Sequence, residues 1–141
     1  MIILDTNVLS ELMRPEPSQQ VATWVRSQEA TAITAVTVAE ILYGIARLPR
    51  GRRRSTLGSA ATALFAAHAE ATFSFTVDEA PHYAAIAASR EQAGKPIEDV
   101  GAQIASICRR HQVPLATRNV KDFENTGVLV VNPWADPEQR A

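Results

Sequence analysis

The sequence predicts an α/β protein, a three-layer α/β/α sandwich with a central, mostly parallel sheet. Short apolar segments alternate along the chain with stretches of helical spacing, which is typical of parallel strands joined by helices. The chain has 141 residues, and 46% of them are hydrophobic. That size and composition suffice for one ordinary core, so we expect a single domain over residues 1–141.

Five apolar segments are short enough to be strands and are bounded by polar or turn-forming residues. They lie at residues 2–4, 32–34, 73–77, 115–117 and 128–131. Between them, apolar residues at helical spacing predict helices with one core-facing stripe. The stripes are Val38, Ile41, Leu42, Ile45 and Leu48 in one helix and Val100, Ile104, Ile107, Cys108 and His111 in another. A third helix, rich in alanine, is expected to be capped by Asp78, to run through Gln92 and to stop at Gly94.

The charge balance and the cysteine content limit the class of protein. Fourteen basic and fifteen acidic residues give a net charge of −1, which neither favours nor excludes a nucleic-acid partner. The single cysteine, Cys108, cannot form an internal disulfide bond. The first apolar segment ends at Asp5, too early for a signal peptide or a membrane span. We therefore expect a cytoplasmic protein with no membrane segment.

Two acidic residues follow predicted strands. Asp5 comes directly after the first strand, and Asp122 follows the strand at 115–117 by a short turn. Ligands of open parallel sheets bind beyond the carboxyl ends of the strands, so the two carboxylates converge if those strands are neighbours. A second interpretation stays open, in which Asp5 and the Thr and Asn after it merely end a strand and cap a helix.

Glu40 is a third candidate, in a helix that has few other charges. Helical rotation places it opposite the predicted core stripe, which is typical of a solvated outer face. The same face also carries Val36 and Tyr43, however, which indicates a surface that something covers. A carboxylate in covered surroundings needs a partner, because an unpaired buried charge costs several kcal/mol.

A divalent metal ion is a suitable partner for these acids. Carboxylates that gather without histidine or cysteine favour a hard cation such as Mg²⁺, which binds one or two carboxylates and retains water molecules. Such a site activates water for hydrolysis of a phosphodiester. The sequence therefore predicts a metal-dependent hydrolase with Asp5, Glu40 and Asp122 at its site.

Several segments, in order along nearly the whole chain, resemble the PIN-domain proteins of the VapC toxin type. They read MIILDTNVLSEL, VTVAEILYGI, GKPIEDVGAQIASICRRH, LATRNVKDF and VNPW. The resemblance implies a three-layer fold, an acidic Mg²⁺ or Mn²⁺ site and endoribonuclease activity on structured RNA. It also implies a homodimer and a cognate antitoxin, through which alone the chain would reach DNA.

The resemblance assigns roles to individual residues. Asp5, Glu40 and Asp122 match the acids that hold the metal and act in catalysis. Thr6 and Asn119 match polar positions that line the site, and Arg118 is placed beside them for RNA. The cluster of Arg47, Arg50, Arg52, Arg53 and Arg54, predicted to lie in a loop between two helices, could contact RNA or an antitoxin, or remain solvated.

One position departs from the family pattern. The family helix reads Asp-Ala-x-Ile-Ala, whereas this chain has Gly101 before Ala102, Gln103, Ile104 and Ala105. We expect weaker metal binding and RNA cleavage, unless Asp99 or Glu98 replaces the missing acid. Inactivation of a toxic nuclease by substitution and natural loss of activity both stay open as the origin of the glycine.

Two other functions are compatible with parts of the sequence. A catalytically impaired PIN-fold subunit would still act with an antitoxin in DNA-binding autorepression, and Gly101 favours this alternative. A haloacid dehalogenase-like phosphatase would need a second acid two residues after Asp5, where this chain has Asn7. The phosphatase is therefore the weaker alternative.

Overall fold

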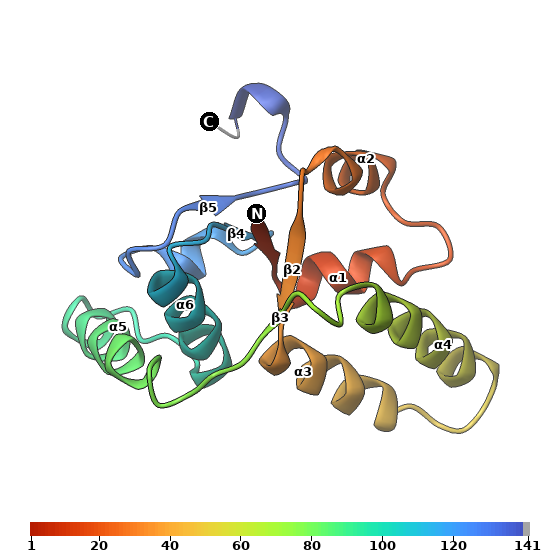
Figure 1. The fold of residues 1–141 in the computed structure, drawn as a ribbon, viewed down its shortest axis with the longest axis horizontal. Helices are drawn as coiled ribbons and strands as arrows, with labels where there is room; N and C mark the ends of the chain where they lie inside the picture. The colour runs from red at the N-terminus through yellow and green to blue at the C-terminus, as the bar shows by residue number, and fades with distance from the viewer. Residues whose placement is uncertain (140–141) are drawn as a thin grey trace.

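Strands and helices alternate along the chain in the computed structural model, which describes residues 1–139 (Figure 1). The strands are β1 (Ile2–Leu4), β2 (Thr31–Thr34), β3 (Thr72–Phe73), β4 (Leu115–Ala116) and β5 (Val130–Val131). The α-helices are α1 (Thr6–Leu12), α2 (Gln19–Ser27), α3 (Ala35–Ala46), α4 (Arg52–Ala67), α5 (Ala80–Gln92) and α6 (Asp99–His111). Two short 3-10 helices follow, η1 (Val120–Phe123) and η2 (Pro137–Gln139). The last two residues of the predicted 1–141 domain lie outside the described part.

The sheet has the strand order β3-β2-β1-β4-β5, and every pairing between these strands is parallel. β1 therefore lies in the centre, between β2 and β4. Ile3 is aligned with Leu115 and Leu4 with Ala116, so β1 and β4 end side by side. The prediction that the strands before Asp5 and Asp122 are neighbours in the sheet is thus confirmed.

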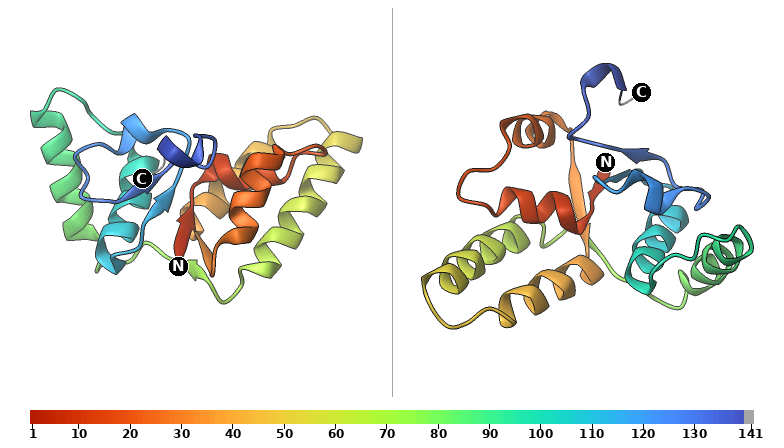
Figure 2. Two further views of the ribbon diagram at one scale, coloured as in Figure 1. Left: turned by 90° about the horizontal axis from the view of Figure 1, so that it is seen from above. Right: turned by 180° about the vertical axis from the view of Figure 1, so that it is seen from behind.

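The two faces of the sheet carry separate cores because side chains alternate along each strand. In β1, Ile2 and Leu4 pack on one side with α1 and α2, whereas Ile3 packs on the other side with α6. Figures 1 and 2 show α1 to α4 on one side of the sheet and α5 and α6 on the other. The predicted three-layer α/β/α sandwich is therefore confirmed.

In helix α6, the apolar stripe predicted from the sequence closely matches the residues that are buried. Ile104, Ile107 and Cys108 are buried against the sheet, while His111 is only half-buried and stacks on Phe73 with ring centroids 4.6 Å apart. Burial raises the pKa of the Cys108 thiol to about 12. Cys108 is thus a structural core residue, as its place on the stripe predicted.

The predicted stripe of α3 is wrong at Leu42, which is 52% exposed. The buried residues of this helix are Thr37 and Ile41. Glu40 consequently borders the buried face and does not lie opposite to it. The hydrophobic pattern missed this because Thr37, a polar residue, occupies a core position.

The start of α5 also differs from the prediction. The third strand was expected at 73–77 but ends at Phe73, because the following residues form the entry to the helix. Asp78 is exposed and does not cap the helix. Glu79 takes that place: it is 1% exposed, and its carboxylate accepts hydrogen bonds from the backbone N–H and the hydroxyl of Thr76.

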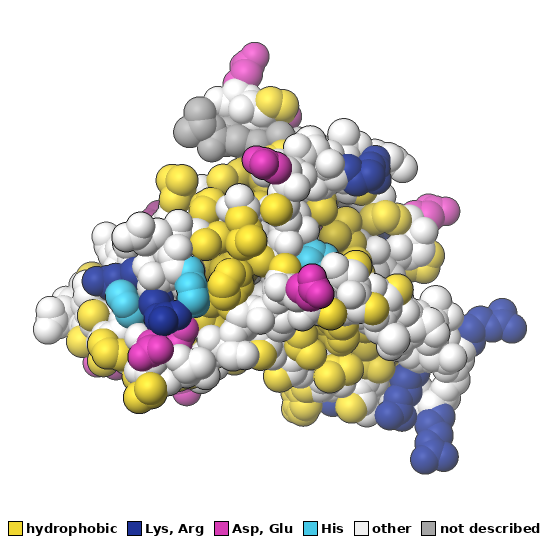
Figure 3. All heavy atoms as spheres, in the orientation of Figure 1, with side chains coloured by type: hydrophobic (Ala, Val, Ile, Leu, Met, Phe, Trp, Pro, Cys, Tyr) yellow, Lys and Arg dark blue, Asp and Glu magenta, His cyan; other side chains and the backbone are white. Residues whose placement is uncertain are grey.

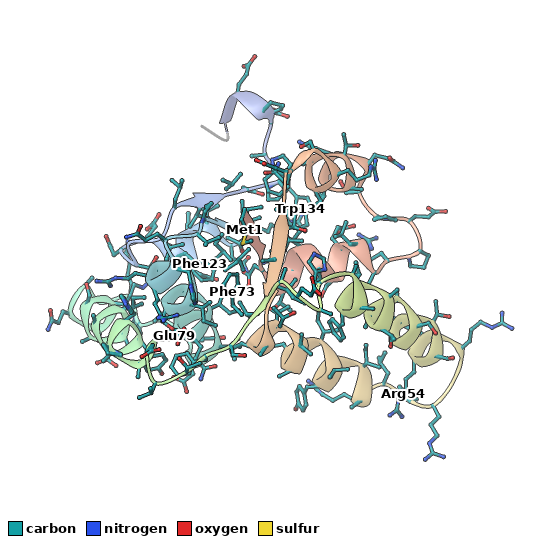
Figure 4. All side chains as sticks on the ribbon, in the orientation of Figure 1. Met1, Arg54, Phe73, Glu79, Phe123 and Trp134 are labelled. Atoms are coloured by element: carbon teal, nitrogen blue, oxygen red, sulfur yellow. The ribbon has the colours of Figure 1, made fainter. Side chains whose placement is uncertain are left out.

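The arginine-rich segment is only partly a loop. Arg52, Arg53 and Arg54 form the first turn of α4, and the loop between α3 and α4 contains Pro49 and Gly51. Figure 3 shows Lys and Arg side chains gathered at this end of the molecule, and Figure 4 shows Arg54 pointing outward. No helix among residues 1–139 is long and apolar enough to cross a membrane.

Candidate active site

A cleft of about 910 Å³ opens at the carboxyl ends of β1 and β4. Its wall includes three acids from separate parts of the chain, Asp5, Glu40 and Asp122. It also includes the predicted polar residues Thr6, Arg118 and Asn119. The structure thus places these six residues around one cavity: the argument from the strands predicted this for Asp5 and Asp122 alone, and the chemical roles of all six stay predictions.

Asp5 is a buried acid of the cleft, at 6% exposed. It is the N-cap of α1, and its carboxylate accepts hydrogen bonds from the Thr6 N–H at 2.9 Å and the Thr117 hydroxyl at 2.7 Å. Burial raises its pKa above the ordinary 3.8; the two hydrogen bonds oppose this, and the charges of Glu40 and Asp122 add to it. The capping interpretation and the site interpretation of Asp5 therefore both hold for its position.

Glu40 is held in place by the residue that follows Asp5. The Thr6 hydroxyl donates to Glu40 Oε1 at 2.5 Å, and it lies 3.0 Å from the Thr37 hydroxyl. Because Thr6 begins α1 and Glu40 lies in α3, this contact joins two walls of the cleft. Thr6 thus positions one acid through its backbone N–H and another through its hydroxyl.

Asp122 lies in η1, the short turn after β4. The Asp122 N–H donates to the Asn119 carbonyl at 3.0 Å, and the next residue, Phe123, is buried in the core against α6. Figure 4 labels Phe123 beside this helix. The Asp122 side chain itself is exposed. The turn is therefore anchored by Phe123 while its carboxylate remains open to the cleft.

Thr117 and Asn7 were not predicted as site residues, yet they connect the two strand ends. The Asn7 side-chain amide donates to Thr117 Oγ1 at 3.1 Å, and Asn7 Oδ1 accepts from the Arg118 N–H at 3.1 Å. Thr117 is fully buried and donates to Asp5. The available signal was a hydroxyl residue at the end of a predicted strand, beside the acid-bearing turn.

Arg118 is the basic residue next to these acids. Its guanidinium lies over the ring of Trp134, with the carbon centre 4.9 Å from the ring centroid. Both residues line the cleft, and Figure 4 shows Trp134 near the start of the C-terminal segment. A cation held on an aromatic face keeps its N–H edge available to an anion.

Glu11 is a further acid on the cleft wall that the sequence did not single out. It accepts a hydrogen bond from the Ser18 N–H at 3.0 Å and forms an ion pair with Arg14 at 3.2 Å. The Ser18 N–H lowers the pKa of Glu11 more than burial raises it, and the charges of Arg14 and Arg118 lower it further. Glu11 is therefore occupied in fixing the loop between α1 and α2.

Gly101 lies in α6 on the wall of the same cleft. A Cβ atom built at Gly101 would lie 3.4 Å from Cγ1 and 3.6 Å from Cδ1 of Ile97, which are ordinary contacts. The helix therefore has room for the Cβ atom of a larger residue at this position. The glycine leaves an acid missing from the cleft without any steric requirement for its absence.

The two acids proposed to replace the missing one are placed differently. Glu98, the N-cap of α6, lines the cleft. Asp99 is not among the residues that line it; its carboxylate instead accepts a hydrogen bond from the Tyr83 hydroxyl of α5 at 2.9 Å. Asp99 lies two residues before Gly101, and two residues along a helix turn a side chain to roughly the opposite face. This placement conflicts with the predicted catalytic role of Asp99.

The carboxylate oxygens of the cleft are donors that a hard divalent cation prefers, but they do not surround one ion completely. The acids of the cleft offer oxygen donors, and the charges of Glu40 and Asp122 act on Asp5. Within the described part of the chain, no three His, Cys, Asp or Glu groups stand close enough to hold one ion. In the described arrangement the carboxylates of Asp5, Glu40 and Asp122 therefore do not form a three-carboxylate site, and the metal-binding role of this set stays a prediction.

The fold and the cleft together place the chain in a class of α/β proteins, namely those in which several carboxylates gather at the carboxyl edge of a parallel sheet. The PIN domain family matches residues 2–129 of the chain. The chain therefore belongs to the PIN domain family.

Known proteins similar to nearly the whole chain include one named as a ribonuclease and one named as a toxin. VapC ribonuclease Y4jK of Sinorhizobium fredii is 36% identical over 95% of this chain and 98% of its own length. Toxin FitB of Neisseria gonorrhoeae is 34% identical over 96% of this chain and its full length. A solved structure of FitAB bound to a DNA fragment matches with a TM-score of 0.89 and 34% identity, over 96% of this chain and 97% of that one.

Proposed function

We propose that the chain is the toxin of a toxin–antitoxin pair and that its acidic cleft hydrolyses phosphodiester bonds of structured RNA with Mg²⁺ or Mn²⁺. The observation that carries the proposal is the gathering of Asp5, Glu40 and Asp122 on one cleft wall beside a cationic Arg118. The names of the relatives support it, since one is a VapC ribonuclease and another is the toxin FitB.

Asp5, Glu40 and Asp122 are the residues that would hold the metal, at most two of them directly in the arrangement described and the third through a bound water molecule. A bound divalent cation lowers the pKa of a water molecule and neutralises charge that develops on the phosphate. The chain's own contribution is to orient the carboxylates, since the Thr6 hydroxyl fixes Glu40 and the Thr117 hydroxyl fixes Asp5. The buried position of Asp5 favours a cation, because its charge is otherwise poorly solvated.

The substrate would be held by groups beside the acids. Arg118, stacked on Trp134, presents a guanidinium to an RNA phosphate. Thr6 and Asn119 add polar groups from the same wall. Bases unstacked from a loop of a structured RNA could reach such a cleft, whereas bases inside a duplex could not.

Gly101→Asp tests the proposal directly. The added carboxylate fits beside Ile97 and completes the acidic wall, so we expect RNA cleavage in Mg²⁺ or Mn²⁺ to rise at least about tenfold, the equivalent of ~1.4 kcal/mol of transition-state stabilisation. Cleavage of an RNA panel by both forms measures this. Gly101→Asn, of nearly the same size but uncharged, is the matched control and should not produce the increase.

Equal cleavage by this chain, Gly101→Asp and Gly101→Asn would contradict the proposed role of position 101. Loss of the Gly101→Asp activity on a further Asp5→Asn change would tie the increase to the same cleft. A contaminating ribonuclease would be insensitive to both substitutions.

The alternative function is a catalytically impaired subunit that acts with an antitoxin in DNA-binding autorepression. Gly101 favours it, and so does the solved structure of FitAB bound to DNA, a relative at 34% identity. In both functions we propose a homodimer and a cognate antitoxin, with DNA bound only through the antitoxin. Complex formation and operator binding without any cleavage, even after Gly101→Asp, would favour the alternative.

A further inference from the structure

Arg90 is a buried cation that neither the family resemblance nor the proposed chemistry uses. It lies in the last turn of α5, is 5% exposed and contributes to the cleft wall. Burial of a guanidinium is costly unless its charge is compensated. Among residues 1–139, no carboxylate forms an ion pair with it. Its compensation must therefore come from other groups.

Backbone carbonyls supply that compensation, and they belong to residues that adjoin two segments of the cleft wall. Arg90 Nε donates to the Lys95 carbonyl at 2.6 Å. Arg90 Nη1 donates to the Lys121 carbonyl at 3.3 Å and to the Glu124 carbonyl at 2.7 Å. Residues 121 and 124 stand on either side of Asp122 and Phe123. The guanidinium thus forms hydrogen bonds with the backbone on both sides of Asp122.

Besides Arg90, the turn that carries Asp122 is held by the buried Phe123 side chain and by the Thr126 hydroxyl, which donates to the Phe123 carbonyl at 2.6 Å. The turn is a single 3-10 turn without a side-chain cap at its N-terminal end, and β4 before it is only two residues long. Its own backbone hydrogen bonds run from Asp122 N–H to the Asn119 carbonyl and from Glu124 N–H to the Lys121 carbonyl. A charged donor that bonds the carbonyls of residues 121 and 124 therefore restrains the direction in which Asp122 points.

We propose that Arg90 is a positioning residue that holds the Asp122 turn, and with it the loop before α6, in the arrangement the acidic cleft requires. The inference rests on the proposed function for its catalytic consequence but not for its structural one. The Lys95 carbonyl lies shortly before Glu98 and Gly101, so one side chain links the α6 wall of the cleft to the Asp122 wall.

Hydrogen exchange of the full chain tests the structural part. Arg90→Met removes every donor but keeps much of the apolar stem, and we expect amides of residues 119–126 to exchange at least about tenfold faster, with residues 2–12 unchanged. Arg90→Lys keeps the charge but has no planar fork, so it should give an intermediate increase. Lys95→Ala is the matched control, since it breaks only the exposed Lys95–Glu124 ion pair across the same junction.

Mn²⁺ affinity and RNA cleavage test the catalytic part. For residues that orient metal ligands, loss typically lowers metal affinity or activity by about 10 to 100-fold. We expect Arg90→Met to weaken Mn²⁺ binding within that range. In the Gly101→Asp background, Arg90→Met should lower kcat and leave the KM for RNA within about twofold. At temperatures below the unfolding transition the variant is still folded, so a loss of stability alone would not lower kcat.

Three results would overturn the inference. They are unchanged exchange in residues 119–126, an equal increase over the whole chain, and an effect of Lys95→Ala as large as that of Arg90→Met. If Arg90→Met does not fold, Arg90→Lys decides in the same way. If Gly101→Asp with Arg90 intact cleaves no RNA, the proposed function fails, while the exchange and Mn²⁺ measurements still decide the role of Arg90.

Discussion

Hydroxyl groups set the positions of the carboxylates in the cleft. Thr117 is fully buried and donates to Asp5 Oδ2 at 2.7 Å, and Thr6 donates to Glu40. Valine has nearly the same shape as threonine but has no donor. A valine at either position would preserve packing and leave a carboxylate oxygen without its hydrogen bond.

Thr117→Val should therefore lower the free energy of unfolding at pH 7 by about 1–3 kcal/mol. The pKa of Asp5, already raised by burial, should rise further because the Thr117 hydroxyl now lowers it. Denaturant unfolding and NMR titration of Asp5 measure the two effects. Thr62→Val, at an exposed site in α4, is the control; a loss no larger than that of the control would contradict the assigned role.

How far single residues could be predicted depends on whether their signal was local. Asp5 and Asp122 follow apolar segments that form strands, so their convergence followed from the sheet. Thr117 and Arg90 act on groups far away along the chain or on backbone carbonyls, which no residue pattern reveals. Glu40 was selected for an incorrect reason, because its helix buries Thr37 and exposes Leu42.

Helix α5 shows how an element begins without the residue that the sequence indicated. Asp78 looked like the cap, but Glu79 reaches back to Thr76 and also faces Arg110 at 3.4 Å. This resembles a capping box, in which a hydroxyl residue and an acid three positions later satisfy each other. Burial raises the pKa of Glu79, but the Thr76 bonds and the Arg110 charge outweigh it and hold the pKa below the ordinary 4.5.

Glu79→Gln should lower the free energy of unfolding at neutral pH by about 1–3 kcal/mol, because charge-assisted hydrogen bonds are lost from a buried site. A depressed folded-state pKa gives stability that is present above the unfolded pKa near 4.5 and is lost as the pH falls through the folded value. The difference from the parent should therefore shrink below pH 4.5. Urea unfolding at several pH values measures it, and a difference that stays constant with pH would contradict the assignment.

Elements were more predictable than their ends. β1 has the predicted bounds, β2 begins one residue before its predicted segment, and β4 ends one residue before the end of its own. Helix α5 ends at Gln92 just before Gly94, which has a positive φ of 72°. The expected strand at 128–131 is shortened to Val130–Val131. Strand ends depend on pairing with a neighbour, and periodicity carries no information about the neighbour.

At the scale of the whole molecule, charges of both signs gather at the cleft. Five acids line it, namely Asp5, Glu11, Glu40, Glu98 and Asp122, together with four arginines, Arg14, Arg53, Arg90 and Arg118. Arg90 and Arg14 are already bonded to backbone carbonyls and to Glu11, respectively, whereas the carboxylates of Asp5, Glu40 and Asp122 form no ion pair among residues 1–139. The folded state should therefore bind divalent cations more strongly than the unfolded chain does.

Mn²⁺ should raise the apparent free energy of unfolding according to mass action, by about 2.7 kcal/mol at a free concentration one hundred times Kd. Thermal unfolding across a Mn²⁺ series measures the gain. Asp5→Asn should abolish most of it, whereas Glu70→Gln, at an exposed acid outside the cleft, should not. A gain that is the same in both variants would mean that the ion binds elsewhere.

The central place of β1 has a consequence for synthesis of the chain. β1 pairs with β2 on one side and with β4, more than a hundred residues later, on the other. A nascent polypeptide still lacking β4 and the Asp122 turn cannot assemble the acidic cleft, however well its first half has folded. The cleft is therefore complete only after the segment that carries Asp122 has been made and has joined β1 in the sheet.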